Sequence, residues 1–439
     1  MTAVEQVPAI DKSASVKTTP AFRRLAIASS LGSAIEHYDF FVYAFTAPIV
    51  FDAFFFPKMD SVASTMAVYA TFAVGFVARP LGGIVFGHYG DRLGRKAMLM
   101  ITFLLMGIAS FFIGCLPSYD SIGLLAPLAL VVLRFIQGFA FGGEYMNAVS
   151  LTLENAPSRR RGFFASWINA SGPVGVICAS GLIALLGFVY SREEFAAWVW
   201  RVPFLLSLLL VLIGTYVRSH VDESMLFLAA REKSDDRMPI LTVLRDWKKP
   251  VLQACLVNMV HSAFNYMSTV FVLGYAVKTL AMPQSSITSG VTVANIVEMC
   301  AVPLIAAFSD RRGRRPFILL GIVLAAIWYP IFFQILLTKN AFAIMGGFVV
   351  SIGLIHATMF APEAAFTAEL FPTPVRVSGS SLGKQLGIVL GGGMAPLIGA
   401  ALMGSGTSFT PVIFYFETIA ALAFIAVLLA PENARKVLS

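Results

Sequence analysis

The sequence predicts an all-α integral membrane protein whose twelve transmembrane helices form two pseudo-symmetric six-helix halves. Three observations predict this fold class: the composition, the number of long apolar segments, and two loop sequences that recur in both halves of the chain. Of the 439 residues, 58% are hydrophobic and only 13% are charged, whereas soluble domains carry about 25% charged residues. Too few polar side chains are present to cover a soluble enzyme or nucleic-acid binder of this length, despite the net charge of +8.

Twelve segments have the length and composition of bilayer-spanning helices, which need about 20 mostly apolar residues. They cover approximately residues 24–51, 63–87, 97–116, 123–148, 162–188, 200–217, 251–276, 287–308, 316–337, 341–368, 377–402 and 411–430. The four cysteines all lie within these segments without CxxC spacing. We therefore expect neither disulfides nor a metal site.

The basic residues are distributed unequally between the two ends of these segments. With both termini placed in the cytoplasm, 24 of the 32 Lys and Arg residues fall in cytosolic loops and tails, four on the opposite side, and four within helices or at their ends. Short cytoplasmic loops of membrane proteins collect Lys and Arg. We therefore predict a multi-pass protein of the cell (inner or plasma) membrane with cytoplasmic termini, whose positive charge requires no nucleic-acid partner.

The longest polar stretch between apolar segments divides the chain into two units. We expect a cytosolic N-terminal tail at 1–23, a six-helix bundle at 24–217, a cytosolic linker at 218–250, a second six-helix bundle at 251–430 and a cytosolic C-terminal tail at 431–439. The tail at 1–23 shows no cleavage pattern of a signal peptide.

The two predicted bundles contain similar loops at matching places. GHYGDRLGRK follows the second apolar segment and AFSDRRGRRP follows the eighth, while the spacing of Glu154, Pro157 and Arg161 recurs in Glu369, Pro372 and Arg376. Such repeats indicate a duplicated six-helix unit. They favour a binding site at the interface between the halves, near the middle of the membrane and reached alternately from each face.

At these loops the chain resembles the major facilitator superfamily, and five further stretches resemble its metabolite:proton symporter family of shikimate, α-ketoglutarate, citrate and proline/betaine permeases. Those stretches are IEHYDFFVYA, FAVGFVARPLGG, LRFIQGFAFGGE, WRVPFLLS and FTAELFPTPVRVSGSSLG. The resemblance implies the major facilitator fold and proton-driven uptake of a small carboxylate or zwitterion, with no cofactor beyond the proton gradient, by a monomer. The chain departs from the family pattern after Glu144 and at Glu363 and Lys384.

Charged residues inside a membrane are candidates for function, because each costs about 3 kcal/mol at the helix centre. Glu36 and Asp39 lie three residues apart on the first segment, with Tyr43 on the same helical face. Arg134 on the fourth segment falls at a similar depth. We interpret the two acids as the proton site, because close, buried carboxyls resist being ionised together, and Arg134 as their switchable counter-ion. A static ion pair between the two helices is the alternative.

Three further charges lie nearer the cytosolic ends of their helices. Arg79 is a gate or anion contact, or else a partner of Glu144. For Glu363 and Lys384 we favour a mutual salt bridge over direct binding of a substrate anion by Lys384. Because both positions depart from the family pattern, their charges are expected to compensate each other.

Polar residues on the seventh segment follow helical spacing and predict a water-lined cavity or interhelical hydrogen bonds. The stripe comprises His261, Asn265, Ser268 and Thr269 with Tyr266 beside it, and the eighth segment adds Thr292, Asn295 and Glu298. His356 is a candidate proton relay, since histidine titrates near physiological pH. The expected substrate cavity comprises Tyr43, Arg79, His261, Asn265, Tyr266, Asn295 and Lys384.

The signature loops predict a cytosolic gate. Glycines allow a tight turn, and an acid can pair with basic groups or a helix N-terminus across the interface between halves. The expected gate residues are Gly87, Asp91, Arg92, Gly94, Arg95, Asp310 and Arg311. The other interpretation of these loops is a solvated turn that serves topology alone.

These features predict alternating access, in which an external proton neutralises Glu36 or Asp39 and frees Arg134 to meet an incoming carboxylate. A proton-antiport exporter of a drug or antibiotic would use the same fold and acidic pair, and SGPVG at 171–175 resembles an antiporter motif. A non-transporting membrane sensor is a further alternative. No nucleophile motif, phosphate loop or cluster of metal ligands favours an enzyme.

Overall fold

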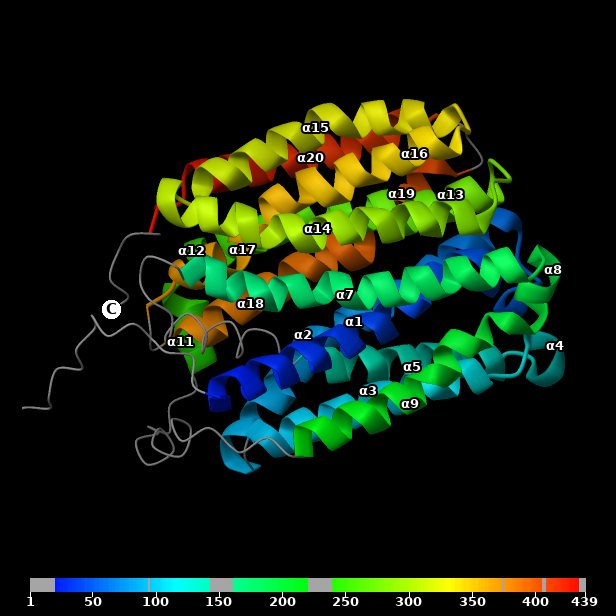
Figure 1. The fold of residues 1–439 in the computed structure, drawn as a ribbon, viewed down its shortest axis with the longest axis horizontal. Helices are drawn as coiled ribbons and strands as arrows, with labels where there is room; N and C mark the ends of the chain where they lie inside the picture. The colour runs from blue at the N-terminus through cyan, green and yellow to red at the C-terminus, as the bar shows by residue number, and fades with distance from the viewer. Residues whose placement is uncertain are drawn as a thin grey trace, which may run out of the picture.

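In the computed structural model the long apolar segments are all helices, lying side by side with roughly parallel axes (Figure 1). The structure describes residues 20–93, 95–142, 161–219, 239–372, 375–404 and 408–433. Within these ranges, side chains are not described at 20–31, 87–93, 95–99, 161, 162, 164, 165, 168, 217–219 and 239–241.

The first six spans are built from one long helix each. They are α1 (Pro20–Phe55), α2 (Ser61–Leu93), α3 (Arg95–Cys115), α5 (Leu125–Phe141), α7 (Arg161–Val189) and α9 (Arg201–Ser219). Short elements join them, namely α4 (Tyr119–Ile122), α8 (Arg192–Glu194) and the π-helical turn η1 (Phe195–Val199).

Three of the second six spans contain a π-helical segment. The seventh span is α12 (Lys248–Tyr266), η2 (Met267–Phe271) and α13 (Val272–Lys278), the tenth is α16 (Ala341–Phe348), η3 (Val349–His356) and α17 (Ala357–Glu369), and the eleventh is α18 (Arg376–Ile388), η5 (Val389–Gly393) and α19 (Met394–Met403). The eighth, ninth and twelfth spans are α14 (Gln284–Arg312), α15 (Arg315–Leu337) and α20 (Thr410–Leu428). A short helix, α11 (Pro239–Asp246), lies within the predicted linker and packs against α18.

The predicted number of spans is confirmed. In the described part of the chain, nine helical runs are each long and apolar enough to cross a membrane, and the bent pair Arg192–Val199 and Arg201–Tyr216 adds one more span. Met100–Cys115 and Leu125–Phe141 are shorter apolar helices that complete the twelve. Large apolar side chains cover the outside of the bundle: Ile84, Leu209 and Leu304 are each more than half exposed. Such a surface requires lipid rather than water as its solvent.

Local sequence signals fix several helix starts at the end of the bundle remote from the chain termini. We call this end distal, and the end where α1 begins and α20 ends proximal. Asp60 caps α2 by accepting from the amides of Val62 and Ala63, each at 3.0 Å. Ser191 and Glu194 form a reciprocal capping box at α8. These side chains satisfy amides that have no partner within their own helix.

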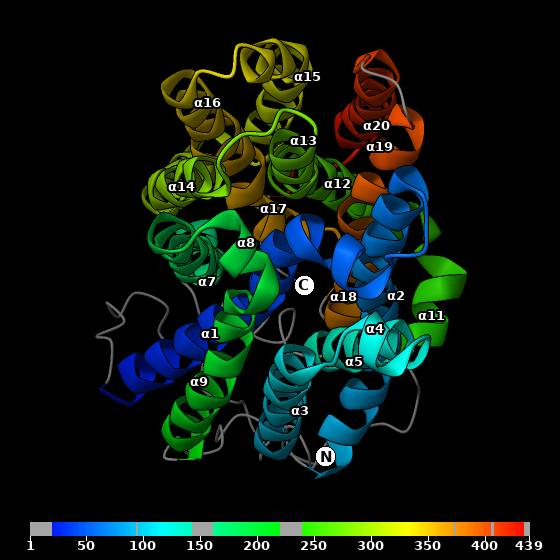
Figure 2. The ribbon, with the colours of Figure 1, turned by 90° about the vertical axis from the view of Figure 1, so that its right-hand side faces the viewer.

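The two groups of six helices meet along two seams. Viewed from the distal end, α7 of the first group lies beside α14 of the second, and α2 lies beside α19 (Figure 2). At the second seam, a Cβ atom on Gly393 would come 2.8 Å from the Cβ atom of Phe76. Glycine at this position therefore lets the eleventh span approach α2 closely, which brings side chains of both halves into one central space.

Candidate functional site

Six aromatic side chains surround two buried arginines where the halves meet. This aromatic cage consists of Phe40, Tyr43, Phe72, Phe76, Phe141 and Tyr266. Tyr266 comes from the second half and contacts the rings of Phe40 and Phe76 at centroid distances of 6.3 and 5.3 Å. Aromatic faces attract cations, so the cage provides a binding environment for guanidinium groups away from water.

Arg134 of α5 is fully buried in this cage. Its guanidinium carbon lies 3.9 Å from the ring centre of Tyr43, and Nη1 donates a very short hydrogen bond to Gln137. Gln137 in turn donates to the hydroxyl of Ser110 at 2.7 Å and to the backbone oxygen of Asp39 at 3.3 Å. Arg134 also donates from Nη2 to the backbone oxygen of Phe72 at 3.4 Å, while its Nε has no hydrogen-bond partner among the described residues.

Two glycines let α2 pack closely on α5 and leave space there for the side chain of Arg134. A Cβ atom on Gly75 would lie 2.6 Å from Nη2 of Arg134, and one on Gly138 would lie 1.8 Å from the backbone oxygen of Gly75. Larger residues at either position would displace the arginine or separate the helices. The two glycines thus position the buried charge.

Arg79 of α2 is 3% exposed and packs among the rings of Phe40, Phe76 and Phe141, with centroid distances of 4.1 to 4.3 Å. Among the described residues its Nε and Nη2 atoms have no hydrogen-bond partner, and Tyr266 faces its guanidinium. Within the same part of the chain, no carboxylate lies within ion-pair distance of Arg79, and Glu144, its alternative predicted partner, lies outside the described residues. A buried guanidinium without an anion is costly, so this position is suited to receive an anionic ligand.

The two carboxyls predicted as the proton site are both buried, Glu36 at 7% and Asp39 at 1% exposure. Within the described ranges Oδ1 of Asp39 has no hydrogen-bond partner. Glu36 takes part in an interaction whose partner is not described. The expected ion pair between Arg134 and these carboxyls is not formed in this conformation, because the side chain of Gln137 occupies the hydrogen-bonding position at Arg134.

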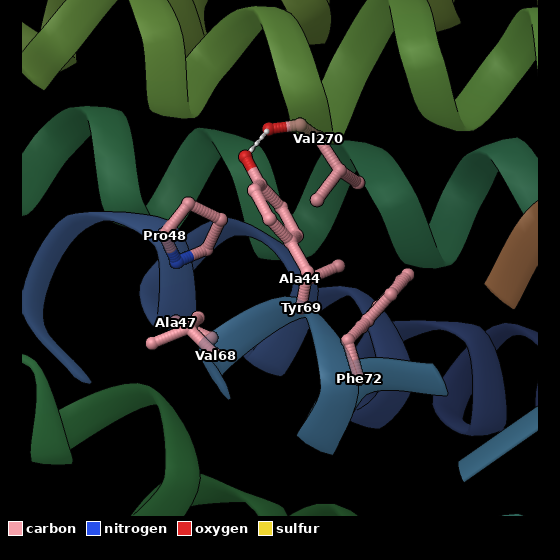
Figure 3. A pocket seen from close by; sticks show the side chains of 7 residues that line it. All are labelled: Ala44, Ala47, Pro48, Val68, Tyr69, Phe72 and Val270. Carbon is pink, nitrogen blue, oxygen red and sulfur yellow. Dashed lines mark hydrogen bonds between the residues drawn. The ribbon is translucent and has the colours of Figure 1, made fainter. Parts of the chain in front are cut away.

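The central space is closed toward the distal end. Lys278 of α13 forms an ion pair with Asp52 of α1 at 2.5 Å. The hydroxyl of Tyr69 donates to the backbone oxygen of Val270 at 3.5 Å (Figure 3). Beneath it lies a small apolar pocket without room for a water molecule, and it is lined by Ala44, Ala47, Pro48, Val68, Tyr69, Phe72 and Val270. First-half and second-half residues therefore meet on this side.

Contacts between the halves also close the proximal side. The amide of Phe163 donates to Asp310 at 2.9 Å, Asn169 donates to the backbone oxygen of Phe360 at 3.0 Å, and Gln385 donates to that of Gly142 at 3.3 Å. Contacts between the halves are therefore present on both sides of the central space.

Asp310, one of the predicted gate residues, belongs to a buried ionic cluster. Arg314 binds Asp310 at 2.8 Å and Glu369 at 3.1 Å. Burial opposes the charge of Arg314, but its two acidic neighbours, with Glu369 the stronger, raise its pKa above the ordinary value. The sequence interpretation named Arg311 instead, whose side chain is exposed. Gly94 and the side chains of the other predicted gate residues, Gly87, Asp91, Arg92 and Arg95, lie outside the described residues.

The salt bridge favoured between Glu363 and Lys384 is present. Nζ of Lys384 lies 2.8 Å from Oε2 of Glu363, which is fully buried. The other carboxylate oxygen, Oε1, accepts from the hydroxyl of Thr367 at 3.0 Å. This pair lies in the second half, where Lys384 is close enough to Arg79 for the two positive charges to repel each other.

A second buried polar group lies between α12, η3 and α14. Nδ1 of His356 is 2.5 Å from Oε1 of Glu298, and Nε2 of His356 is 3.4 Å from Nδ1 of His261. Nε2 of His261 is 3.3 Å from Oδ1 of Asn258, and Nδ2 of Asn258 donates to the hydroxyl of Thr367. Hydrogen bonds therefore connect Glu298 to Lys384 across five helical elements.

The remaining predicted cavity residues lie apart from these groups. Asn295 is buried, but its amide donates to the backbone oxygen of Val291 in its own helix at 2.9 Å. Asn265 is partly exposed within the seventh span. Gln137 and Asn258 were not predicted, although each lies three residues from a predicted polar side chain, so that extending the helical spacing would have found them.

Two six-helix groups that enclose buried ionisable side chains between them define a membrane transporter. Comparison with known proteins agrees: the model of the Major Facilitator Superfamily matches residues 29–384 and 254–438. The shikimate transporter of Escherichia coli (strain K12) is 36% identical over 387 residues, covering 87% of this chain and 88% of that protein. The proline/betaine transporter of the same strain is 30% identical over 425 residues, covering 94% and 84%.

The same fold is found in solved structures. The crystal structure of a D-xylose-proton symporter matches with a TM-score of 0.75 and 17% sequence identity, over 95% of this chain and 100% of that one. The chain therefore belongs to the Major Facilitator Superfamily. It is a multi-pass membrane transporter for a small molecule and not an enzyme.

Proposed function

We propose that this transporter is a proton-coupled symporter that takes up a small organic acid or zwitterionic metabolite by alternating access. The observation that carries this proposal is Arg79, a buried guanidinium between the halves whose Nε and Nη2 donors have no hydrogen-bond partner among the described residues. A substrate carboxylate would supply both the missing charge and the missing hydrogen-bond acceptors. The substrates for which the two relatives are named, shikimate and proline or betaine, all carry a carboxylate.

The proton would bind at Asp39 or Glu36. Gln137 joins Arg134 to the backbone oxygen of Asp39, so the Asp39 residue adjoins the contact that holds Arg134, and a change in the charge of its carboxyl would alter the electrostatic potential there. If occluding the site with one uncompensated charge costs about 3 kcal/mol, movement without the proton is slowed about a hundredfold. That ratio is sufficient to couple substrate and proton.

We further propose that the proximal end faces the cytoplasm, because the basic residues gather there. Residues 1–23 and 431–439 would then be cytosolic tails, 218–250 a cytosolic linker, and 24–217 and 251–430 the moving bundles. We propose that the monomer is functional, since the central site is made entirely within one chain.

The test is uptake by purified protein in proteoliposomes under imposed proton gradients, with labelled shikimate, proline, betaine and D-xylose as probes. We expect an inward proton gradient to drive accumulation of at least one carboxylate-bearing probe, a protonophore to abolish it, and D-xylose to be excluded. Arg79→Met should abolish this uptake, whereas Arg192→Met, at an exposed residue of α8, should not. Loading driven only by the opposite gradient would establish export instead, and uptake unaffected by Arg79→Met would refute the proposed site.

A further inference from the structure

In the series of hydrogen bonds between Lys384 and Glu298, the chemistry of the groups determines which atom donates and which accepts at each step. An ammonium group only donates hydrogen bonds and a carboxylate only accepts them. Lys384 therefore donates to Glu363, and the hydroxyl of Thr367 donates to the other oxygen of Glu363. Having given its hydrogen, the Thr367 oxygen is left as an acceptor.

Asn258 carries this direction to the histidines. Its Nδ2 atom donates to Thr367 at 3.3 Å and to the backbone oxygen of Ala254 at 2.8 Å. Turning the amide over would place Oδ1 against the Ala254 carbonyl, two acceptors in contact. Oδ1 therefore faces His261 and accepts from its Nε2 atom, so this nitrogen carries a hydrogen.

This donor-to-acceptor direction has a consequence for Glu298, His356 and His261. If the carboxylate is ionised and both imidazoles are neutral, the three groups have one hydrogen too few for the contacts between them. Neutral His261 then has a bare Nδ1 facing Nε2 of His356, while Nδ1 of His356 faces a carboxylate oxygen. Neutral His356 has one hydrogen for these two contacts. One of the two must therefore join acceptor to acceptor, at 3.4 Å or at 2.5 Å, in a place where water cannot relieve the mismatch.

One additional proton completes both contacts. It fits on His356 as an imidazolium beside ionised Glu298, on Glu298 as a carboxylic acid beside neutral His356, or on His261 with His356 reversed. The three arrangements contain the same number of protons, and each satisfies every hydrogen bond of the group. The buried group is then neutral overall, as burial favours.

We propose that Glu298, His356 and His261 form a proton-binding site in the second half of the transporter, separate from the carboxyls of α1. The charged groups that face it are Glu363 and Lys384 along the chain, with Arg79 of α2 beyond Lys384. Both imidazole rings also lie against Phe360, at centroid distances of 5.1 and 5.6 Å. Phe360 accepts from Asn169 of α7, so the site adjoins a contact between the halves.

The site deepens the proposed proton coupling and rests on it for its use in transport. Release of its proton would break a hydrogen bond beside the seam of α7 and α14. Retention of the proton would preserve this hydrogen bond and so favour the packing of α7 on α14 described above. The presence of the proton can nevertheless be tested without any transport measurement.

The full chain contains only five histidines, so ¹⁵N labelling of histidine gives a simple solid-state NMR spectrum in lipid bilayers. His261→Asn and His356→Asn assign the ring signals, and infrared spectroscopy reports protonated carboxyl groups. At neutral pH we expect His261 to carry a hydrogen on Nε2. We also expect either a doubly protonated ring in this pair or a protonated carboxyl band that disappears in Glu298→Gln.

Glu298→Gln should also change the His356 Nδ1 signal, since a neutral amide that cannot ionise then replaces the carboxyl at this nitrogen. Glu417→Gln, at a partly buried acid of α20 that takes no part in this series of hydrogen bonds, should leave these signals unchanged. Two singly protonated rings beside an ionised Glu298 would overturn the proposal, and the wild-type spectra alone suffice for that result if a variant fails to fold. Because no substrate is involved, the result is independent of the uptake assay.

Discussion

The charges of Glu363 and Lys384 permit a quantitative test of what this buried pair does. Glu363 is fully buried, and its only partners in the described part of the chain are Lys384 and the hydroxyl of Thr367. Lys384→Met leaves the carboxylate with that hydroxyl alone. Breaking a buried ion pair by removing one partner costs about 3 to 5 kcal/mol, and we expect a loss of this size in the free energy of unfolding.

Removing both charges should restore most of this stability. In Glu363→Gln with Lys384→Met, the glutamine oxygen still accepts from Thr367 and the methionine chain fills a similar volume. Replacing both members of a buried pair is often neutral or stabilising, so we expect the double variant to lie within about 1.5 kcal/mol of the wild type. The measurement is unfolding in mixed detergent and SDS, with Lys339→Met, at an exposed distal residue, as control.

Uptake by the same variants distinguishes the two roles of Lys384. If the lysine serves only as counter-ion to Glu363, transport recovers together with stability in the double variant. If it binds the substrate anion, stability recovers and transport does not. A Lys384→Met variant within about 1 kcal/mol of the wild type would refute the reasoning, because an unpaired buried carboxylate cannot be so inexpensive.

Three other predictions follow from the site. Asp39→Asn should retain counterflow exchange in proteoliposomes but lose accumulation against a gradient; undiminished accumulation in this variant would remove the proton role of this residue. Gly75→Ala should destabilise the protein by about 1 to 3 kcal/mol through overpacking against a guanidinium, whereas Gly346→Ala, with open space around its Cβ position, should not; equal melting temperatures would contradict this. Asp52→Asn removes the ion pair with Lys278 and should weaken the distal contact between the halves by up to about 1 kcal/mol, or roughly fivefold. The measurement is the rate of thiol labelling of a cysteine placed in the pocket of Figure 3, which should rise. Exchanging the charges of Asp52 and Lys278 should restore slow labelling.

The fold was predictable because each span leaves a one-dimensional signal. Runs of about 20 apolar residues predicted all twelve helices, and the recurring loops predicted their division into two groups. The bend between α8 and α9 and the π-helical segments were not predictable in this way. They depend on packing against neighbouring helices, whereas the apolar run registers only length and composition.

The candidate site was predictable in its residues but less so in its contacts. Depth along a helix placed Arg134 near Asp39, but depth does not specify which way a side chain points, and Gln137 intervenes. The pairing of Glu363 with Lys384 was easier to predict, because two opposite charges both departed from the family pattern. The link between His261 and His356 joins spans 95 residues apart, for which the single sequence contains no pairing signal.

The π-helical segments bear on how the two halves have diverged. A π turn inserts one residue into the helical repeat and rotates everything that follows it relative to an unbroken helix. Such turns interrupt the seventh, tenth and eleventh spans, while in the described first half only η1, near the distal end, is of this type. Positions that match between the two halves in sequence thus no longer point in equivalent directions. A side chain moved from one half to the matching position of the other would lie on a different face of its helix. The two halves are therefore not interchangeable.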